Sequence, residues 1–470
     1  MVNQYIYLFP FEKIPRNSRI LIYGAGDVGQ EYLKQIKATG YCEVIGFVDR
    51  AHDKYPSMIV PIYAPERIAH LEYDYLVLAM KTGMYVKEIT DNLLSQSPNI
   101  NEKIIYVGSR EEISILLEKN TRSEAAENFA FEKNCLSIAL KYGTGLGDCI
   151  VKKKLFEEIV KFAPNCLIDI YAPNASKYIK SIYENHPNLN LIIDDGGAVY
   201  AQNSNRYALT MKVFFMIQID YVNFEKIETW NSDFAAKIKL LKQRCEEYQL
   251  TPFPPSQNKL HFDRMKYIKA NYYTTFAYND VFDIKDTSTS IPLKKEAEKD
   301  FIQLGLGRYI TINYGNGSAP QRAEIVAKQW PLEYFDAFVK LFKEKYPFIK
   351  VIQLGTENAF KIMAADQFIL GESLELSKYV LKNALFHLDI EGGLVHLATQ
   401  LGTKCIVLFG PTPVHFFGYQ QNVNIVSEKC NGCYCLYDNI NQCARNMEKP
   451  ECMYSIKPET VMEAVKSIIT

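Results

Sequence analysis

Apolar runs of strand length alternate with segments of helical period in the first part of the chain. Strand-like runs are RILIYG (19–24), CEVIGFVDR (42–50), DYLVLAM (74–80) and KIIYVG (103–108), and EYLKQIKATG (31–40) has helical period. Such alternation predicts a parallel sheet with helices on its faces. Residues 1–110 are therefore predicted to form a Rossmann-like module that binds a nucleotide or docks another protein.

The same alternation of strand-like and helical segments occurs twice more along the chain. One set of strand-like runs is CLSIAL (135–140), CLIDIYAP (166–173) and LNLIIDD (189–195), and the next is RYITINYG (308–315), FIKVIQLG (348–355) and KCIVLFGPT (404–412). The sequence thus predicts an α/β protein with three Rossmann-like domains. Residues 111–133 form a charged helical connector, followed by lobes at 134–300 and 301–470. Residues 205–300 show no clear period and are interpreted as an irregular, loop-rich insert suited to substrate capture.

Composition narrows the class of protein. Hydrophobic residues make up 48% and charged residues 23%, which is typical of a folded domain and excludes dominant disorder. The 53 Lys and Arg balance the 54 Asp and Glu, so no net field attracts nucleic acid. The first residues lack the pattern of a signal peptide, and no apolar run reaches the roughly 20 residues of a membrane helix. A cytoplasmic protein with no transmembrane segment is expected.

The first glycine cluster is a GxGxxG pattern between a strand and a helix, made by Gly24, Gly26 and Gly29. Asp49 ends the next strand, where a ribose-binding acid would stand. Glycines of this kind let a pyrophosphate approach a helix N-terminus, but they also make tight turns and close helix packing. Nucleotide binding and a structural or docking role both stay open.

A second glycine cluster, YGTGLGDCIV, follows the first strand of the second lobe. Gly143, Gly145 and Gly147 bring the backbone close to any ligand, and Asp148 stands at the start of the next helix. An acid there is commonly a helix cap. A carboxylate at the mouth of a sheet is also well placed to act as a general base.

The third lobe adds motifs in a fixed order. After GLGD (145–148) come KQWP (328–331), a strand ending LG (354–355), EGGLVHLATQLG (391–402) and LFGPT (408–412). This order resembles glycosyltransferase family 9, the ADP-heptose heptosyltransferases of lipopolysaccharide synthesis, over about residues 135–470. The resemblance implies that the last two domains form a GT-B glycosyltransferase with a nucleotide-sugar donor between two lobes.

The resemblance also implies roles for single residues. Asp148 matches the catalytic base, with Gly145 and Gly147 beside it. The residues implied to contact the donor's phosphates or adenosine are Lys328, Glu357, Glu391, Gly392, Gly393, His396 and, in a loosely matched loop, Asn316, Gly317 and Ser318. A lysine and helix-start amides would then neutralise the leaving diphosphate, so that the transfer needs no Mg²⁺.

One position departs from the family. The usual aspartate followed by Ser or Thr is replaced by Glu391 and Gly392, which changes contacts near the donor sugar. The donor is then not necessarily the standard heptose. For His396, a buried histidine packed on an apolar helix face is the structural alternative to phosphate binding.

Five of the 11 cysteines lie between residues 430 and 452. In a reducing compartment such a cluster indicates a metal site more often than disulfides. Cys430, Cys433, Cys443 and Cys452 are chosen as a tetrahedral set for structural iron or zinc, with Cys435 left over or replacing Cys433. The segment is similar to one in the autotransporter heptosyltransferases, relatives that modify protein Ser or Thr and hold iron with four cysteines.

The sequence therefore predicts an inverting glycosyltransferase that moves a sugar, heptose from ADP-heptose, to a glycan or protein hydroxyl. A catalytically altered transferase serving as a binding or scaffold protein is one alternative. An NAD-dependent nucleotide-sugar-modifying enzyme is another, although no acid/base pair for it follows the GxGxxG pattern. Homo-oligomers and the acceptor, whether lipopolysaccharide, capsule or protein, stay open.

Overall fold

The computed structural model describes residues 9–55, 60–80, 86–96, 98–106, 135–173, 176–195, 197–248, 255–278, 280–315, 327–436 and 442–469. Asn316, Gly317, Ser318 and the predicted connector at 111–133 lie outside these residues. The chain divides into two compact units. Unit 1 is Met1–Lys133 with Asp195–Arg206, and unit 2 is Asn134–Asp194 with Tyr207–Thr470. None of the described helices is long and apolar enough to cross a membrane.

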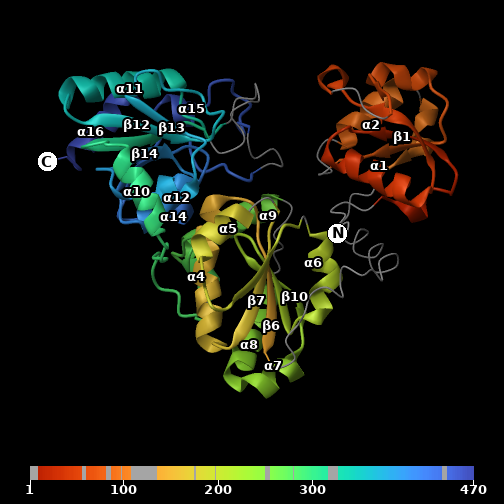
Figure 1. Ribbon diagram of the computed structural model, residues 1–470, viewed down its shortest axis with the longest axis horizontal. Helices are drawn as coiled ribbons and strands as arrows, with labels where there is room; N and C mark the ends of the chain where they lie inside the picture. Colours follow the sequence, from red (N-terminus) through yellow and green to blue (C-terminus); the bar gives the residue numbers. More distant parts are fainter. Residues whose placement is uncertain are drawn as a thin grey trace. The chain divides into compact units, whose positions relative to one another are not determined.

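Unit 1 contains a parallel five-stranded sheet in the order β3-β2-β1-β4-β5 (Figure 1). Buried apolar residues on the central strands face the helices on both sides of the sheet. The bounds are β1 (Arg19–Tyr23), α1 (Asp27–Thr39), β2 (Glu43–Val48), β3 (Ile62–Tyr63), β4 (Tyr75–Leu78), α2 (Val86–Gln96) and β5 (Ile104–Ile105), with α6 (Ala198–Asn203) in the second segment of the unit.

The first sheet of unit 2 has the order β10-β9-β6-β7-β8, parallel except for the β9–β10 hairpin. Its strands are β6 (Leu136–Lys141), β7 (Cys166–Tyr171), β8 (Leu189–Ile193), β9 (Leu209–Val213) and β10 (Ile217–Val222). Its helices are α4 (Leu146–Phe162), α5 (Ser176–Tyr183), α7 (Phe224–Trp230), α8 (Ser232–Tyr248) and α9 (Pro255–Tyr267).

The prediction of an irregular insert at 205–300 was wrong, because the described part of this stretch holds a hairpin, the helices α7, α8 and α9, and the start of the helix at Lys295–Gln303. The apolar run that contains the hairpin has no break in hydrophobicity at its turn. Val213 and Ile217 pair across that turn, so the turn is made by apolar residues without the usual glycine or asparagine signal.

The second sheet of unit 2 is parallel and six-stranded, in the order β13-β12-β11-β14-β15-β16. With the other two sheets it confirms the predicted α/β class with three Rossmann-like sheets. The strands are β11 (Tyr309–Asn313), β12 (Lys350–Gly355), β13 (Gln367–Leu370), β14 (His387–Ile390), β15 (Cys405–Phe409) and β16 (Val423–Val426). The helices are α10 (Lys295–Gln303), α11 (Leu332–Lys345), α12 (Leu374–Lys382), α13 (Gly393–Gln400), α14 (Val414–Phe417), α15 (Glu451–Tyr454) and α16 (Pro458–Lys466).

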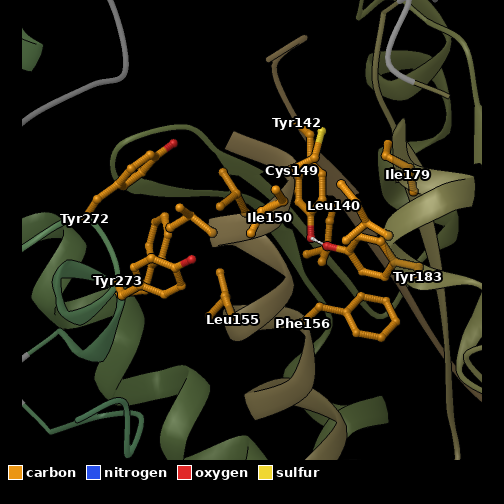
Figure 2. Packing of buried hydrophobic residues seen from close by; sticks show 14 of the residues in the cluster. Leu140, Tyr142, Cys149, Ile150, Leu155, Phe156, Ile179, Tyr183, Tyr272 and Tyr273 are labelled. Carbon is orange, nitrogen blue, oxygen red and sulfur yellow. Dashed lines mark hydrogen bonds between the residues drawn. The ribbon is translucent and has the colours of Figure 1, made fainter. Parts of the chain in front are cut away.

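The two lobes of unit 2 share one continuous apolar core. The cluster includes Ile150 on α4 of the first lobe and Val395 on α13 of the second, with Tyr272 and Tyr273 from the segment after α9. Figure 2 shows these two tyrosines beside the residues of α4, and it shows the hydrogen bond between the Tyr142 and Tyr183 hydroxyls. Burial of this surface holds the lobes together as one unit.

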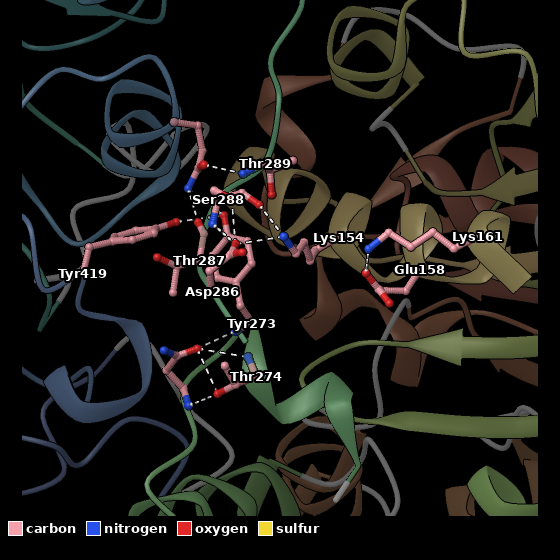
Figure 3. Close-up of polar contacts among 12 residues, drawn as sticks. Lys154, Glu158, Lys161, Tyr273, Thr274, Asp286, Thr287, Ser288, Thr289 and Tyr419 are labelled. Carbon is pink, nitrogen blue, oxygen red and sulfur yellow. Dashed lines mark hydrogen bonds and ion pairs between the residues drawn. The ribbon is translucent and has the colours of Figure 1, made fainter. Parts of the chain in front are cut away.

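A linker segment, residues 283–294, joins the lobes and is held by long polar side chains from both of them. Figure 3 shows Lys154 of α4 bound to Asp286 and Ser288 in this segment. Lys153 on α4 donates to the Ser290 carbonyl at 2.7 Å, and Lys378 on α12 donates to the Pro292 carbonyl at 2.9 Å. Gln400 at the end of α13 accepts from the Thr289 N–H at 2.6 Å. Both lobes therefore determine the path of the linker.

The GxGxxG turn of unit 1 provides a matched stability test. A Cβ on Gly29 would overlap the Gly24 carbonyl oxygen, whereas a Cβ on Gly26 would meet nothing within 4 Å. Gly29 lies inside α1, where alanine is favoured over glycine by about 1 kcal/mol, but a backbone clash costs about 1–3 kcal/mol or more. Gly26 is the N-cap of α1, where replacing glycine by alanine costs less than such a clash. Gly29→Ala should therefore speed hydrogen exchange of the β1 and α1 amides more than Gly26→Ala does. Equal exchange in the two variants would contradict this packing.

Candidate functional site

Asp148 is held by the turn between β6 and α4. The N-cap of α4 is Gly145, and Asp148 is the third residue of the helix. A Cβ on Gly145 would lie 2.7 Å from Asp148 Oδ2. The carboxylate therefore folds back over the glycine turn, which leaves no room for a side chain at Gly145.

Tyr272 is the partner of Asp148 that sequence reasoning missed. Its hydroxyl donates to Asp148 Oδ1 at 2.5 Å, and its backbone N–H donates to the Phe416 carbonyl at 2.8 Å. Burial, and then the charge of Asp148, raise the pKa of Tyr272 well above its ordinary value, so its hydroxyl stays protonated. Tyr272 lies in the stretch that was interpreted as irregular, and no spacing in the sequence links it to Asp148.

Lys328, Glu391 and His396 form a charged group in the second lobe, in which Glu391 and His396 are buried and Lys328 is half-buried. Lys328 Nζ lies 2.6 Å from Glu391 Oε2, and His396 Nε2 lies 3.5 Å from Glu391 Oε1. The Lys328 contact is an ion pair without good hydrogen-bond geometry. Burial favours the neutral form of Glu391, but the charge of Lys328 and the contact with His396 outweigh it and lower its pKa to about 2. Glu391 therefore stays ionised between two donors.

The first turns of α4 and α13 bring the two halves of the site together. A Cβ on Gly147 would overlap the His396 ring, and a Cβ on Gly393 would lie 3.0 Å from the Leu146 Cβ. The Tyr272 and His396 rings are 6.5 Å apart at 78°. Glycines at both crossing points thus let the acid of one lobe approach the charged group of the other.

The predicted residues gather as follows. Gly145, Gly147 and Asp148 lie at the start of α4, and Glu391, Gly392, Gly393 and His396 lie at the start of α13, with Lys328 paired to Glu391. Glu357 does not belong to this charged group. It is exposed after β12, where it packs against Gly371.

In unit 1, Asp49 is used by the glycine turn itself. Its Oδ2 accepts from the Ala25 N–H at 2.9 Å and from the Tyr55 hydroxyl at 3.2 Å, and its Oδ1 accepts from the Ala51 N–H at 2.8 Å. Gly24 has φ of 106°, so the turn requires glycine there. These contacts favour the structural role for Gly24, Gly26, Gly29 and Asp49 over ribose binding.

The C-terminal cysteines separate into a group of four and one other. Burial, followed by the charges of Cys430, Cys433 and Cys443, raises the pKa of Cys452 to about 12. These four thiols are thus electrostatic neighbours. Cys435 is buried with φ of 64°, and its charged neighbour is Lys328. In the described ranges, no three His, Cys, Asp or Glu side chains are arranged closely enough to hold a metal.

The contacts of Glu391 with Lys328 and His396 predict that the free energy of unfolding depends on pH. The folded pKa of about 2 lies below the ordinary 4.5, so the contribution is complete above pH 4.5 and is lost as pH falls toward 2. Urea unfolding of wild type and Glu391→Gln at pH 6 and pH 3.5 should show the wild-type advantage shrinking by about 1 kcal/mol. An advantage that is the same at both pH values would show that Glu391 is not held ionised in the fold.

Two protein-family models match parts of the chain. Residues 296–440 match the model of glycosyltransferase family 9 (heptosyltransferase), and residues 16–106 match the model of the C2185-like N-terminal domain. No curated protein matches the chain.

Several solved structures are similar to the chain at low identity. A family 9 glycosyl transferase from Veillonella parvula DSM 2008 has 17% identity and a TM-score of 0.47, covering 72% of this chain and 98% of that one. The ADP-heptose lipopolysaccharide heptosyltransferase II of E. coli has 13% identity and a TM-score of 0.44, covering 71% and 98%.

The iron-containing dodecameric glycosyltransferase TibC from enterotoxigenic E. coli H10407 has 14% identity and a TM-score of 0.45, covering 72% of this chain and 77% of that one. The two Rossmann-like sheets of unit 2 are consistent with a GT-B-like fold. The match of residues 296–440 to glycosyltransferase family 9 supports a glycosyltransferase, and a C2185-like domain precedes that segment.

Proposed function

We propose that unit 2 is an inverting transferase that moves a sugar from a nucleoside diphosphate to an acceptor hydroxyl. The observation that carries this proposal is the contact between the starts of α4 and α13. Gly147, next to Asp148, lies against the His396 ring, and Glu391 pairs with both His396 and Lys328. A base and a diphosphate-binding surface on opposite sides of one site are what a direct displacement requires.

Asp148 acts as the general base in this proposal. The acceptor oxygen attacks the anomeric carbon, its proton passes to Asp148, and the bond from that carbon to the diphosphate oxygen breaks. Tyr272 holds Oδ1, so Oδ2 is assigned as the atom that takes the proton. One displacement of this kind inverts the anomeric configuration.

Lys328, His396 and the N-terminal amides of α13 stabilise the departing nucleoside diphosphate. Preset donors and a helix N-terminus are suited to the charge that grows on the leaving oxygen. Glu391 already lies between Lys328 and His396, so the diphosphate has to share both donors with its carboxylate. The negative charge of Glu391 therefore favours a nucleotide sugar whose diphosphate contacts Lys328 and the helix amides at the same time.

The donor is proposed to be ADP-heptose, on the motifs shared with family 9, and the acceptor a glycan or protein hydroxyl. Glu357 and the loop at 316–318 are proposed to contact the nucleotide. Among rivals, a binding or scaffold protein with an altered site is favoured only by the Glu391 departure. The internal hydrogen bonds of Asp49 weaken the NAD-dependent alternative.

The four neighbouring thiols are proposed to hold a structural iron or zinc. Tetrahedral thiolate coordination suits either metal. Cys452 is buried, and Cys430, Cys433 and Cys443 are half-buried. Gly410 packs against both Met453 and Cys452, so the cluster is tied to the turn after β15. A metal there would fix the segment that carries Tyr434, over whose ring Lys328 lies at 5.6 Å.

Substitution of the base separates chemistry from binding. Asp148→Asn should lower the transfer rate about 10²–10⁴-fold, the range for loss of a general base, and keep nucleotide binding. Asp233→Asn is the matched control, because Asp233 is an exposed acid in the first turn of α8. The measurement is transfer from a panel of ADP- and UDP-sugars, with binding followed by thermal shift. Near wild-type turnover of Asp148→Asn would refute the assigned base.

Metal content tests the cysteine proposal. Elemental analysis of the purified chain should find iron or zinc, and Cys430→Ser, Cys433→Ser, Cys443→Ser or Cys452→Ser should lower it severalfold. Cys435→Ser is the control that retains the metal, because Cys435 stands apart from the four. Metal loss in Cys435→Ser with retention in Cys433→Ser would replace the proposed set by the alternative one.

A further inference from the structure

His396 has a different partner on each ring nitrogen. Nε2 faces Glu391 Oε1 at 3.5 Å, and Nδ1 lies 2.6 Å from the Tyr419 hydroxyl. A neutral imidazole carries its proton on one nitrogen, and the hydrogen bond at the other nitrogen decides which. Ionised Glu391 favours a proton on Nε2, and the direction of the Tyr419 contact determines whether Nδ1 is left as the acceptor that this tautomer requires.

The direction of hydrogen-bond donation toward His396 is set at Gln400, whose amide orientation is fixed by backbone groups of the linker segment. The Thr289 N–H can only donate, and it lies 2.6 Å from Gln400 Oε1. The Thr287 carbonyl can only accept, and it lies 2.7 Å from Gln400 Nε2. The remaining N–H of the amide points to the Tyr273 hydroxyl at 3.0 Å, so that hydroxyl oxygen accepts.

From Tyr273 the donors follow one direction to the histidine. Because Tyr273 accepts from Gln400, its own proton goes to Tyr419, whose hydroxyl oxygen is 3.1 Å away. Tyr419 then donates its proton to His396 Nδ1. In the reverse order the Tyr273 proton could not go to the Gln400 amide, which has only donors on that side, and would turn to the Thr289 side chain, which also contacts the Tyr273 hydroxyl. The forward order keeps every proton between Gln400, Tyr273, Tyr419 and His396.

Burial keeps this order intact. Tyr273 and Tyr419 are each 2% exposed and His396 is 4% exposed, so water does not compete for these contacts. Desolvation raises the pKa of both tyrosines above the ordinary value, and each hydroxyl keeps its single proton. Figure 3 shows Tyr273 and Tyr419, which belong to the series, and the linker residues Thr287 and Thr289, which orient Gln400.

We propose that Gln400, Tyr273 and Tyr419 are positioning residues that hold the neutral His396 with its proton on Nε2, directed toward the Glu391 and Lys328 group. The donor proton is then already in place for the diphosphate of a nucleotide sugar, a part that rests on the function proposed above. Gln400 takes its orientation from the linker. The His396 Nε2–H donor therefore depends on the position of the linker between the lobes. Neighbouring Tyr272 binds Asp148, so one of two adjacent tyrosines contacts the base and the other reaches the histidine through Tyr419.

The test is ¹⁵N NMR of the full chain labelled at histidine, with the His396 signals identified by their loss in His396→Gln. Wild type should show Nε2 protonated and Nδ1 bare. Tyr419→Phe removes the donor to Nδ1 and should shift the tautomer ratio toward Nδ1–H by roughly tenfold, the size of one hydrogen bond. Tyr309→Phe is the control, because Tyr309 is a buried tyrosine of the same lobe that donates to the Val380 carbonyl.

Gln400→Glu gives a second and opposite test. A carboxylate accepts from Tyr273, which reverses the series and should place the proton of His396 on Nδ1. Nδ1–H in the wild type, or Tyr419→Phe and Gln400→Glu spectra equal to the Tyr309→Phe spectrum, would overturn the proposal. The tautomer is read without substrate, so a chain with these spectra but no transfer activity would refute the proposed function separately.

Discussion

The close approach of two helix N-termini, α4 from the first lobe and α13 from the second, is the constraint on which the site depends. Gly147 lies against the His396 ring, and Gly393 lies against Leu146. A side chain at Gly147 would force the His396 ring to move, and one at Gly393 would press on the Leu146 Cβ. Everything proposed about the chemistry follows from this contact, because the acid and the charged group come from different sheets.

Polar contacts around the linker keep these helices in place. Lys153, Lys378 and Gln400 bind linker carbonyl and amide groups from both lobes, and the shared apolar core supplies the larger burial. Gln400 also begins the hydrogen bonds that end at His396. The position of the linker and the position of the histidine proton therefore both depend on the hydrogen bonds of Gln400.

Much of the fold and part of the site were predictable from sequence. The glycine turns, Asp148 and His396 follow apolar strands, and parallel topology places the ends of such strands at one edge of a sheet. Tyr272, Tyr273 and Tyr419 were missed because they reach the site through tertiary packing and have no periodic signal. The β9–β10 hairpin was missed because apolar residues make its turn. Asp49 has the spacing of a ribose ligand, yet Ala25, Ala51 and Tyr55 already occupy its oxygens.

The most direct test of the account compares Gly147→Ala with Gly143→Ala. An added Cβ at Gly147 would overlap His396, whereas one at Gly143 would meet its neighbours at an ordinary 3.7 Å. Displacing a reacting group by about 1 Å costs about 10²-fold in rate. The transfer rate of Gly147→Ala should therefore fall about 10²-fold, and that of Gly143→Ala should stay within a few-fold of wild type. Equal rates in the two variants would contradict a site assembled by this helix contact.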